Sequence, residues 1–143
     1  MAGYSGTPLA RKLGIKDDFR VALLHGPDDV RSELRDALGK CRILPFDRKT
    51  KSKNNEFDFI FLFAKSRAGL ELELLPAAKA LAPAGMLWIS WPKKSSGVVT
   101  DLTEDVIRES GLDAGLVDVK VCAVTEVWSG LKFVIPVKNR PKK

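Results

Sequence analysis

The segment Phe57–Lys65 constrains the fold of this chain more than any other part of the sequence. It reads FDFIFLFAK and is too apolar for a strand with one face in water. A run of this kind is typical of a strand buried on both faces of a parallel sheet, where helices cover each side. The sequence therefore predicts an α/β fold with this strand near the centre of the sheet.

The segments on either side alternate between strand and helix patterns. In chain order, the predicted elements are a strand at 19–25, a helix at 28–38, strands at 41–46 and 57–65, a helix at 66–75 with a further turn from Pro76, a strand at 86–91, a helix that starts within 100–104 and runs through Ser110, and strands at 116–126 and 127–137.

Capping and turn residues set the expected ends of these elements. Asp28 is a good N-cap for the first long helix, and Ser66 can cap the next one. Pro83–Gly85 is expected to end the helical region before the fourth strand, and Gly111 is expected to end the helix that starts within 100–104. A short polar connection around Trp128–Gly130 is expected to join the last two strands as an antiparallel hairpin.

These elements predict a three-layer α/β/α Rossmann-like sheet that is mostly parallel, with strand order 2-1-3-4-6-5 and a closing antiparallel hairpin. The length of 143 residues is that of a single domain, 1–143. Within it we distinguish an N-terminal arm at 1–18, a basic loop at 47–56 and a basic tail at 138–143. The glycine-rich start, Gly3–Pro8, is expected to pack as an arm. Alternatively, it folds as a lid over a crevice at the carboxyl ends of the strands, where ligands of such sheets bind.

No apolar run approaches the roughly 20 residues that cross a bilayer, and no signal-peptide core is visible. The sequence thus predicts no membrane partner and a cytoplasmic location. The formal net charge of +6 arises largely from the basic loop and tail. Such segments are typical of solubility features and of nonspecific contacts with polyanions. No known RNA- or DNA-binding motif accompanies them.

Two cysteines, Cys41 and Cys122, are too few for a metal cluster and lack CxxC spacing. They are expected to be buried thiols in a reducing compartment. In the predicted strand order they lie on opposite edges of the sheet, about 24 Å apart, and a disulfide spans at most about 7 Å. An internal bridge would therefore contradict the strand order.

Ligands of doubly wound sheets bind outside the carboxyl ends of the strands, here between the first and third strands. The cations at these strand ends could hold a phosphate or carboxylate with help from nearby hydroxyls and backbone donors. The alternative is that they are ordinary polar loop residues. The candidate ligand-binding residues are His25, Gly26, Asp47, Lys65, Arg67, Trp91, Lys93, Lys94, Ser95 and Ser96.

The sequence offers no catalytic residue with a clear partner. His25 is the single histidine, and only Asp28 and Ser66 are conceivable partners for it as a general base. No Ser-His-Asp order, GxSxG elbow or Walker motif is present. Asp101 is expected to cap a helix. The three tryptophans are expected to pack in the core or hairpin, although Trp91 is placed at the mouth of the crevice.

Parts of the chain resemble the class I S-adenosylmethionine-dependent methyltransferase fold. Ala78–Trp91 (AKALAPAGMLWISW) resembles a helix, turn and strand of that fold, and Leu116–Val137 resembles its closing hairpin. Asp47 follows Gly26 by 21 residues, near the place of the acid that binds the cofactor ribose in such enzymes. The glycine loop departs from the pattern: His25–Asp29 reads HGPDD, in which a proline lacks an N–H and two carboxylates repel an anion.

A closer resemblance, over nearly the whole chain, is to a bacterial family of small proteins of unknown function. It is carried by the segments Ala2–Leu9 (AGYSGTPL), Lys12–Ile15, Trp91–Leu102 (WPKKSSGVVTDL), Gly115–Asp118 and Trp128–Leu131 (WSGL). The basic loop has no counterpart in it that we can place. The resemblance implies fold and location but no activity or cofactor.

These observations lead to one hypothesis and two alternatives. The hypothesis is a non-enzymatic binding or regulatory protein that holds an anionic small ligand or partner group near Lys93 and Lys94 at the strand ends. The first alternative is an enzyme dependent on S-adenosylmethionine or a nucleotide, with Asp47 on the ribose. The second alternative is a nucleic-acid accessory protein that uses the basic loop and tail. The sequence indicates neither a metal site nor an oligomeric state.

Overall fold

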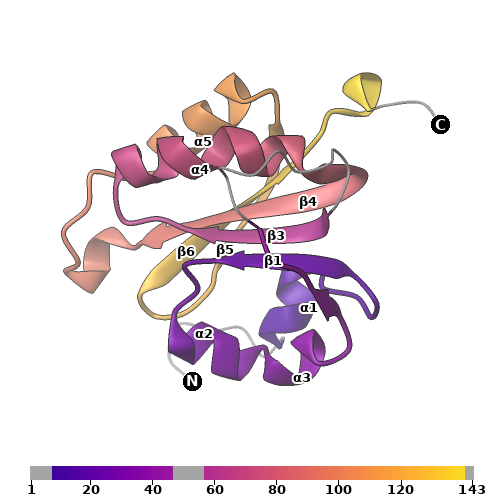
Figure 1. Cartoon of the computed structure of the whole chain (residues 1–143). Coiled ribbons are helices and arrows are strands. Elements are labelled where there is room, and N and C mark those ends of the chain that lie inside the picture. The colour runs from indigo at the N-terminus through magenta and orange to yellow at the C-terminus, as the bar shows by residue number, and fades with distance from the viewer. Residues whose placement is uncertain (1–7, 47–56, 141–143) are drawn as a thin grey trace.

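The computed structural model describes residues 8–46 and 57–140 and contains a six-stranded sheet with helices on both faces (Figure 1). The strand order is β2-β1-β3-β4-β6-β5, as predicted. The strands are β1 (Arg20–Leu24), β2 (Arg42–Ile43), β3 (Phe57–Phe63), β4 (Leu81–Pro92), β5 (Val117–Ala123) and β6 (Trp128–Val134). The helices are α1 (Leu9–Leu13), α2 (Asp28–Glu33), α3 (Arg35–Leu38), α4 (Arg67–Lys79) and α5 (Glu104–Asp113), with 3-10 turns at Lys94–Ser96 and Val137–Asn139.

Strands β2, β1, β3 and β4 run parallel, while β6 pairs antiparallel with both β4 and β5. Helices α4 and α5 cover one face of the sheet, and α1, α2 and α3 cover the other (Figure 1). The apolar strand β3 lies in the interior of the sheet, and every residue in it except Asp58 is buried. The predicted three-layer α/β/α class is therefore confirmed.

The side chains of β3 separate into two hydrophobic cores. Ile60 and Leu62 face α4 and α5, and Phe59, Phe61 and Phe63 face α1 to α3. Successive residues of a strand point to opposite faces, so an unbroken apolar run fills both cores.

Strand β4 begins at Leu81, earlier than the sequence indicates. The predicted stop at Pro83–Gly85 is wrong, because these residues lie inside β4 where its register with β3 shifts between Phe57 and Phe59. A Cβ at Gly85 would stand 2.7 Å from the carbonyl oxygen of Phe57. Glycine is thus required by the close approach of two backbones.

Several helix boundaries differ from prediction, and one of them is the end of α5, which continues past Gly111 to Asp113. Helix α4 is capped by Ser66, as expected, and the further turn expected from Pro76 is continuous with it, so that one helix runs to Lys79. The predicted helix at 28–38 is divided at Leu34 into α2 and α3, and Asp28 is its first residue and not its N-cap, which is Pro27. The helix after the long loop, α5, has Thr103 as its N-cap.

The closing hairpin turns earlier than predicted. Trp128–Gly130 belongs to β6, and the chain reverses before it, where the hydroxyl of Thr125 accepts hydrogen bonds from the backbone N–H groups of Val127 and Trp128. Ser129 and Gly130 suggest a turn because both are typical of turns. In the structure Gly130 lies within the strand and is buried against Val124 and Trp88.

Helix α1 covers part of the second core, the one between the sheet and helices α1 to α3. Leu9 and Leu13 are buried, and the indole nitrogen of Trp88 donates to the carbonyl of Leu13 at 2.8 Å. Lys120 donates to the carbonyl of Lys12 at 3.0 Å, so β4 and β5 both satisfy carbonyls at the end of this helix. The arm-or-lid prediction for Gly3–Pro8 lies outside the described residues except for Pro8.

The cysteines are both free and only partly buried, so the expectation of buried thiols is wrong. The basic loop at 47–56 and the end of the basic tail, 141–143, lie outside the described residues. Across the part that the structure describes, no helix is both long and apolar enough to cross a membrane.

Candidate functional site

A pocket of about 540 Å³ opens at the carboxyl ends of β1 and β3, and we refer to it as the β1–β3 pocket. Its size is within the range of small-molecule sites. The residues that line it are His25, Pro27, Phe63, Lys65, Val98, Val127 and Trp128. Most of this lining is apolar or aromatic, and among the described residues no carboxylate belongs to it.

Two aromatic rings anchor the β1–β3 pocket. Phe63 is the last residue of β3, and Trp128 is the first residue of β6. Their ring centroids are 5.1 Å apart at an interplanar angle of 83°, an edge-to-face contact. Because both side chains are largely buried in the second core, they present a fixed apolar surface to a ligand.

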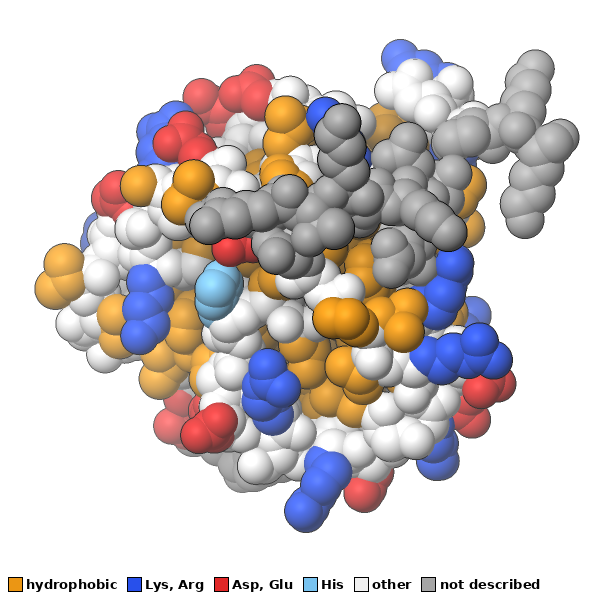
Figure 2. All heavy atoms as spheres, viewed as in Figure 1, with side chains coloured by type: hydrophobic (Ala, Val, Ile, Leu, Met, Phe, Trp, Pro, Cys, Tyr) orange, Lys and Arg blue, Asp and Glu red, His pale blue; other side chains and the backbone are white. Residues whose placement is uncertain are grey.

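His25 follows β1 and contributes the imidazole of the β1–β3 pocket. Its backbone φ is 61°, in the left-handed region that residues other than glycine seldom adopt. Its Nε2 atom lies 3.0 Å from Oε1 of Glu73 on α4. The Glu73 side chain is 14% exposed and the His25 side chain 64%, so the carboxylate is held in the protein and the ring is open to solvent. Figure 2 shows the imidazole, in pale blue, at the surface with hydrophobic side chains beside it.

The turn that follows His25 offers no cradle for an anion. The carbonyl of Gly26 accepts a hydrogen bond from Nε of Arg31 at 3.1 Å. Pro27 has no N–H, and Asp28 and Asp29 occupy the first turn of α2. Two carboxylates at this helix start oppose a negative ligand. An anion in the pocket would therefore be bound by side chains and not by the turn.

The loop after β4 is fixed to the rim of the pocket. The N–H of Lys93 donates to the carbonyl of Val127 at 2.7 Å. The hydroxyl of Ser96 donates to the carbonyl of Lys93 and accepts from the N–H of Val98, so it is occupied within the loop. At the far end, the hydroxyl of Thr100 donates to the carbonyl of Lys65 at 2.6 Å. This last bond ties the loop to the backbone of Lys65 and leaves its ammonium group unaffected.

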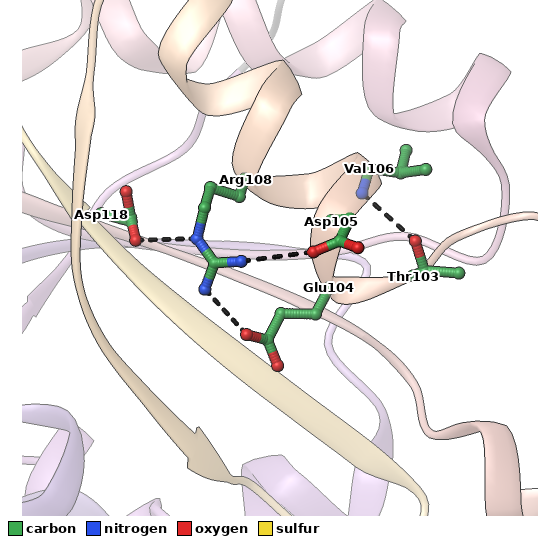
Figure 3. Close-up of polar contacts among 6 residues, drawn as sticks. All are labelled: Thr103, Glu104, Asp105, Val106, Arg108 and Asp118. Carbon is green, nitrogen blue, oxygen red and sulfur yellow. Dashed lines mark hydrogen bonds and ion pairs between the residues drawn. The ribbon is translucent and has the colours of Figure 1, made fainter.

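A second pocket, of about 600 Å³, is lined by residues of this loop and of the start of α5, and we call it the β4–α5 pocket. The residues that line it are Trp91, Lys94, Val98, Thr100, Leu102, Thr103, Glu104 and Asp105. Val98 lines both pockets, and Trp91 belongs to the core beneath α4 and α5. Figure 3 shows the start of α5, where the carboxylates of Glu104 and Asp105 point toward the guanidinium of Arg108.

The structure thus divides the predicted ligand residues among several places. His25 and Lys65 share the β1–β3 pocket, with Gly26 in the adjoining turn, while Trp91 and Lys94 share the β4–α5 pocket. Arg67 lies in a groove of about 190 Å³ between α4 and α5. Ser95 and Ser96 belong to the 3-10 turn Lys94–Ser96, in which Ser95 is exposed, and Lys93 directly precedes this turn. Asp47 lies outside the described residues.

Asp101 acts as a cap, as predicted, but for a different helix. Its Oδ1 accepts from the N–H of Arg67 at the start of α4, 2.8 Å away. The start of α5 is instead capped by Thr103, whose hydroxyl accepts from the N–H of Val106 (Figure 3).

Sequence reasoning missed Glu73, whose carboxylate contacts His25 from outside the pocket lining, because no local motif marks it within α4. It also missed several residues of the β1–β3 pocket itself. Trp128 was assigned to packing, and it packs and lines the pocket at once. The neighbouring Val127 and the loop residue Val98 carry no chemical signal in the sequence. Within residues 8–46 and 57–140, no three His, Cys, Asp or Glu side chains are grouped to hold a metal ion.

Solved structures with a similar fold are methyltransferase-like. One is a chain from a Haloferax volcanii complex that contains the Trm112 methyltransferase activator, with a TM-score of 0.65, 11% identity, and coverage of 90% of this chain and 87% of that one. A second is a TehB-like S-adenosylmethionine-dependent methyltransferase from Corynebacterium glutamicum, with a TM-score of 0.55, 13% identity, and coverage of 94% and 91%. A third is a Burkholderia thailandensis 1,6-didemethyltoxoflavin-N1-methyltransferase with bound S-adenosylhomocysteine, with a TM-score of 0.57, 12% identity, and coverage of 87% and 73%.

At these identities the similarity concerns the fold alone, and it agrees with the methyltransferase-like, Rossmann-type sheet described above. No curated protein matches the sequence. A family model described as "Protein of unknown function (DUF3052)" matches residues 10–137, which is most of the chain. The chain therefore belongs to the DUF3052 family of proteins of unknown function.

Proposed function

We propose that this protein is a non-enzymatic binding protein that holds a small anionic ligand in the β1–β3 pocket. The observation that carries the proposal is the lining of that pocket: aromatic and aliphatic walls with one ammonium group, from Lys65, and one imidazole, from His25. A pocket that is mostly apolar with a few convergent polar groups is typical of a small-molecule site.

The charges around the two pockets favour the β1–β3 pocket for an anion. Lys65 is the only residue of formal charge in its described lining. The β4–α5 pocket has Lys94, but Glu104 and Asp105 line it as well. Both carboxylates pair with Arg108, but they add negative charge to this lining, whereas the described lining of the β1–β3 pocket has none, so we assign the anion to Lys65 and not to Lys94.

The proposal is tested by calorimetric titration of the whole protein with benzoate, nucleoside monophosphates, S-adenosylmethionine and S-adenosylhomocysteine. We expect an anion with a planar ring to bind, and we expect Lys65→Ala to weaken it about tenfold, since a hydrogen bond to a charged group contributes about 1.5 kcal/mol. The bond from Thr100 to the Lys65 carbonyl is retained in this variant.

The matched control is Lys94→Ala, which removes an exposed lysine from the neighbouring pocket and should leave the affinity unchanged. Equal affinity in wild-type protein and Lys65→Ala, or a loss in Lys94→Ala alone, would contradict the assignment. If S-adenosylmethionine or a nucleotide binds and is also consumed, the protein is an enzyme and the proposal fails.

A further inference from the structure

We propose that Glu73 is a positioning residue for His25 and that, through it, the β1–β3 pocket selects anionic ligands that also carry a hydrogen-bond donor, a hydroxyl or an amino group. The inference rests on the function proposed above and names the class of ligand. It follows from the atoms that His25 and Glu73 bring together.

The first step concerns the proton on the imidazole. An ionised carboxylate only accepts hydrogen bonds. Oε1 of Glu73 lies 3.0 Å from Nε2 of His25. A hydrogen bond from the ring to an ionised carboxylate requires the proton on Nε2. In a neutral imidazole the other nitrogen, Nδ1, then has a free lone pair and acts as an acceptor.

The second step concerns which nitrogen a ligand can reach. His25 lines the β1–β3 pocket while its Nε2 is bonded to α4, so Nδ1 is the ring nitrogen left for a ligand. The left-handed backbone of His25 is a conformation that glycine adopts without steric cost. Strained residues of this kind occur preferentially at binding sites.

The third step compares His25 with the rest of the lining. Among the described lining residues, the other side chains come from proline, phenylalanine, lysine, valine and tryptophan. None of these is a conventional hydrogen-bond acceptor. The imidazole is thus the one side chain of the described lining that can accept a hydrogen bond from a ligand. Lys65 is the group that can bind the anion.

A site that hydrogen-bonds a ligand group discriminates against the analogue that lacks it, because its own polar atom is then left without a partner. The pocket should therefore prefer a hydroxylated or aminated anion to the plain one. The preference depends on Glu73, because without its carboxylate the imidazole is free to exchange the proton between its two nitrogens.

The tautomer is measured directly by long-range ¹⁵N–¹H NMR of the whole protein at pH 8. The chain has a single histidine, so one imidazole gives all the signals. We expect the Nε2–H form in wild-type protein and a mixture in Glu73→Gln, whose carboxamide can either donate or accept. Glu71→Gln, on the same helix but in the α4–α5 groove, should keep the wild-type tautomer. An Nδ1–H form in the wild type, or no change in Glu73→Gln, would refute the positioning role.

Ligand selection is measured with benzoate and with 3- and 4-hydroxybenzoate as probes. In wild-type protein we expect at least one hydroxybenzoate to bind more than fivefold tighter than benzoate. The ratio should fall in Glu73→Gln and approach one in His25→Asn, where asparagine tolerates the left-handed backbone but its shorter side chain ends before the place of the imidazole.

The outcomes separate this inference from the function on which it rests. Equal binding of all three probes, with Lys65→Ala weakening each of them, would overturn the ligand class and leave the anion site intact. If neither these probes nor the nucleoside monophosphates and S-adenosyl compounds titrated above bind, the proposed function and the ligand class fail together, and the NMR tautomer still decides whether Glu73 positions His25.

Discussion

Gly111 is a residue at which helix α5 packs closely against the sheet. A Cβ placed there would lie 2.1 Å from a ring carbon of Phe133 on β6, so only a hydrogen atom fits between the helix and the aromatic ring. Both residues are buried. The packing explains why this position is a glycine, and α5 continues past it to Asp113 although the sequence predicts that Gly111 ends the helix.

We expect Gly111→Ala to destabilise the protein. Overpacking a filled core costs about 1–3 kcal/mol, and the better helix propensity of alanine returns at most about 1 kcal/mol. Because the clash is severe, the net loss should be about 2 kcal/mol, measured as a lower midpoint of urea unfolding. Ser110→Ala, at the preceding position of α5, is the control and should change the midpoint little. An unchanged midpoint in Gly111→Ala would mean that the helix can move away from Phe133.

At the scale of elements, one arginine joins α5 to the edge strand β5. Nε of Arg108 donates to Asp118 at 2.9 Å, and its terminal nitrogens contact Glu104 at 2.7 Å and Asp105 at 3.6 Å (Figure 3). The hydrogen bond from Arg108 lowers the pKa of Asp118 below its ordinary value of 3.8. The carboxylate of Asp118 thus favours the folded state while it is ionised.

This contact makes stability depend on pH. A carboxyl group whose pKa is lowered in the folded state stabilises it at pH values above its unfolded pKa, and the contribution disappears as the pH falls through the folded pKa. We expect Asp118→Asn to be less stable than wild-type protein at pH 6, with the difference shrinking below about pH 4. Chemical unfolding at a series of pH values measures this. The same series with Glu109→Gln, an exposed acid on α5, is the control, and a difference for Asp118→Asn that is independent of pH would contradict the argument.

The elements also show how much of the structure can be predicted from local sequence patterns. The interior position of β3 follows from an apolar pattern that is continuous along the chain, and the strand order agrees with the one expected for alternating strands and helices that close in a hairpin. The start of β4 cannot be predicted in this way. Gly85 reads as a turn residue in the sequence, but it is a glycine because the backbone of Phe57 packs directly against it. The site follows only in part: His25 and Lys65 both stand at strand ends, whereas Glu73 reaches His25 through the packing of α4, which no local pattern encodes.

At the scale of the whole molecule, the strand order fixes the separation of the two thiols. Cys41 directly precedes β2, Cys122 lies on β5, and these strands form opposite edges of the sheet. Five strand spacings of about 4.8 Å place the cysteines about 24 Å apart, and a disulfide needs their Cα atoms within about 7 Å. Burial also raises the pKa of both thiols, which reduces the reactive thiolate at neutral pH.

The folded protein should therefore form no internal disulfide. After exposure to oxidised glutathione under native conditions, the intact mass of the monomer should show no loss of the two hydrogens, about 2 Da, that an internal bridge removes, and any bridge should link two molecules. The same treatment in denaturant is the control, because an unfolded chain brings its cysteines together at random and can close the bridge. An internal bridge in folded monomer would place the two edges side by side, which neither this strand order nor an open sheet permits.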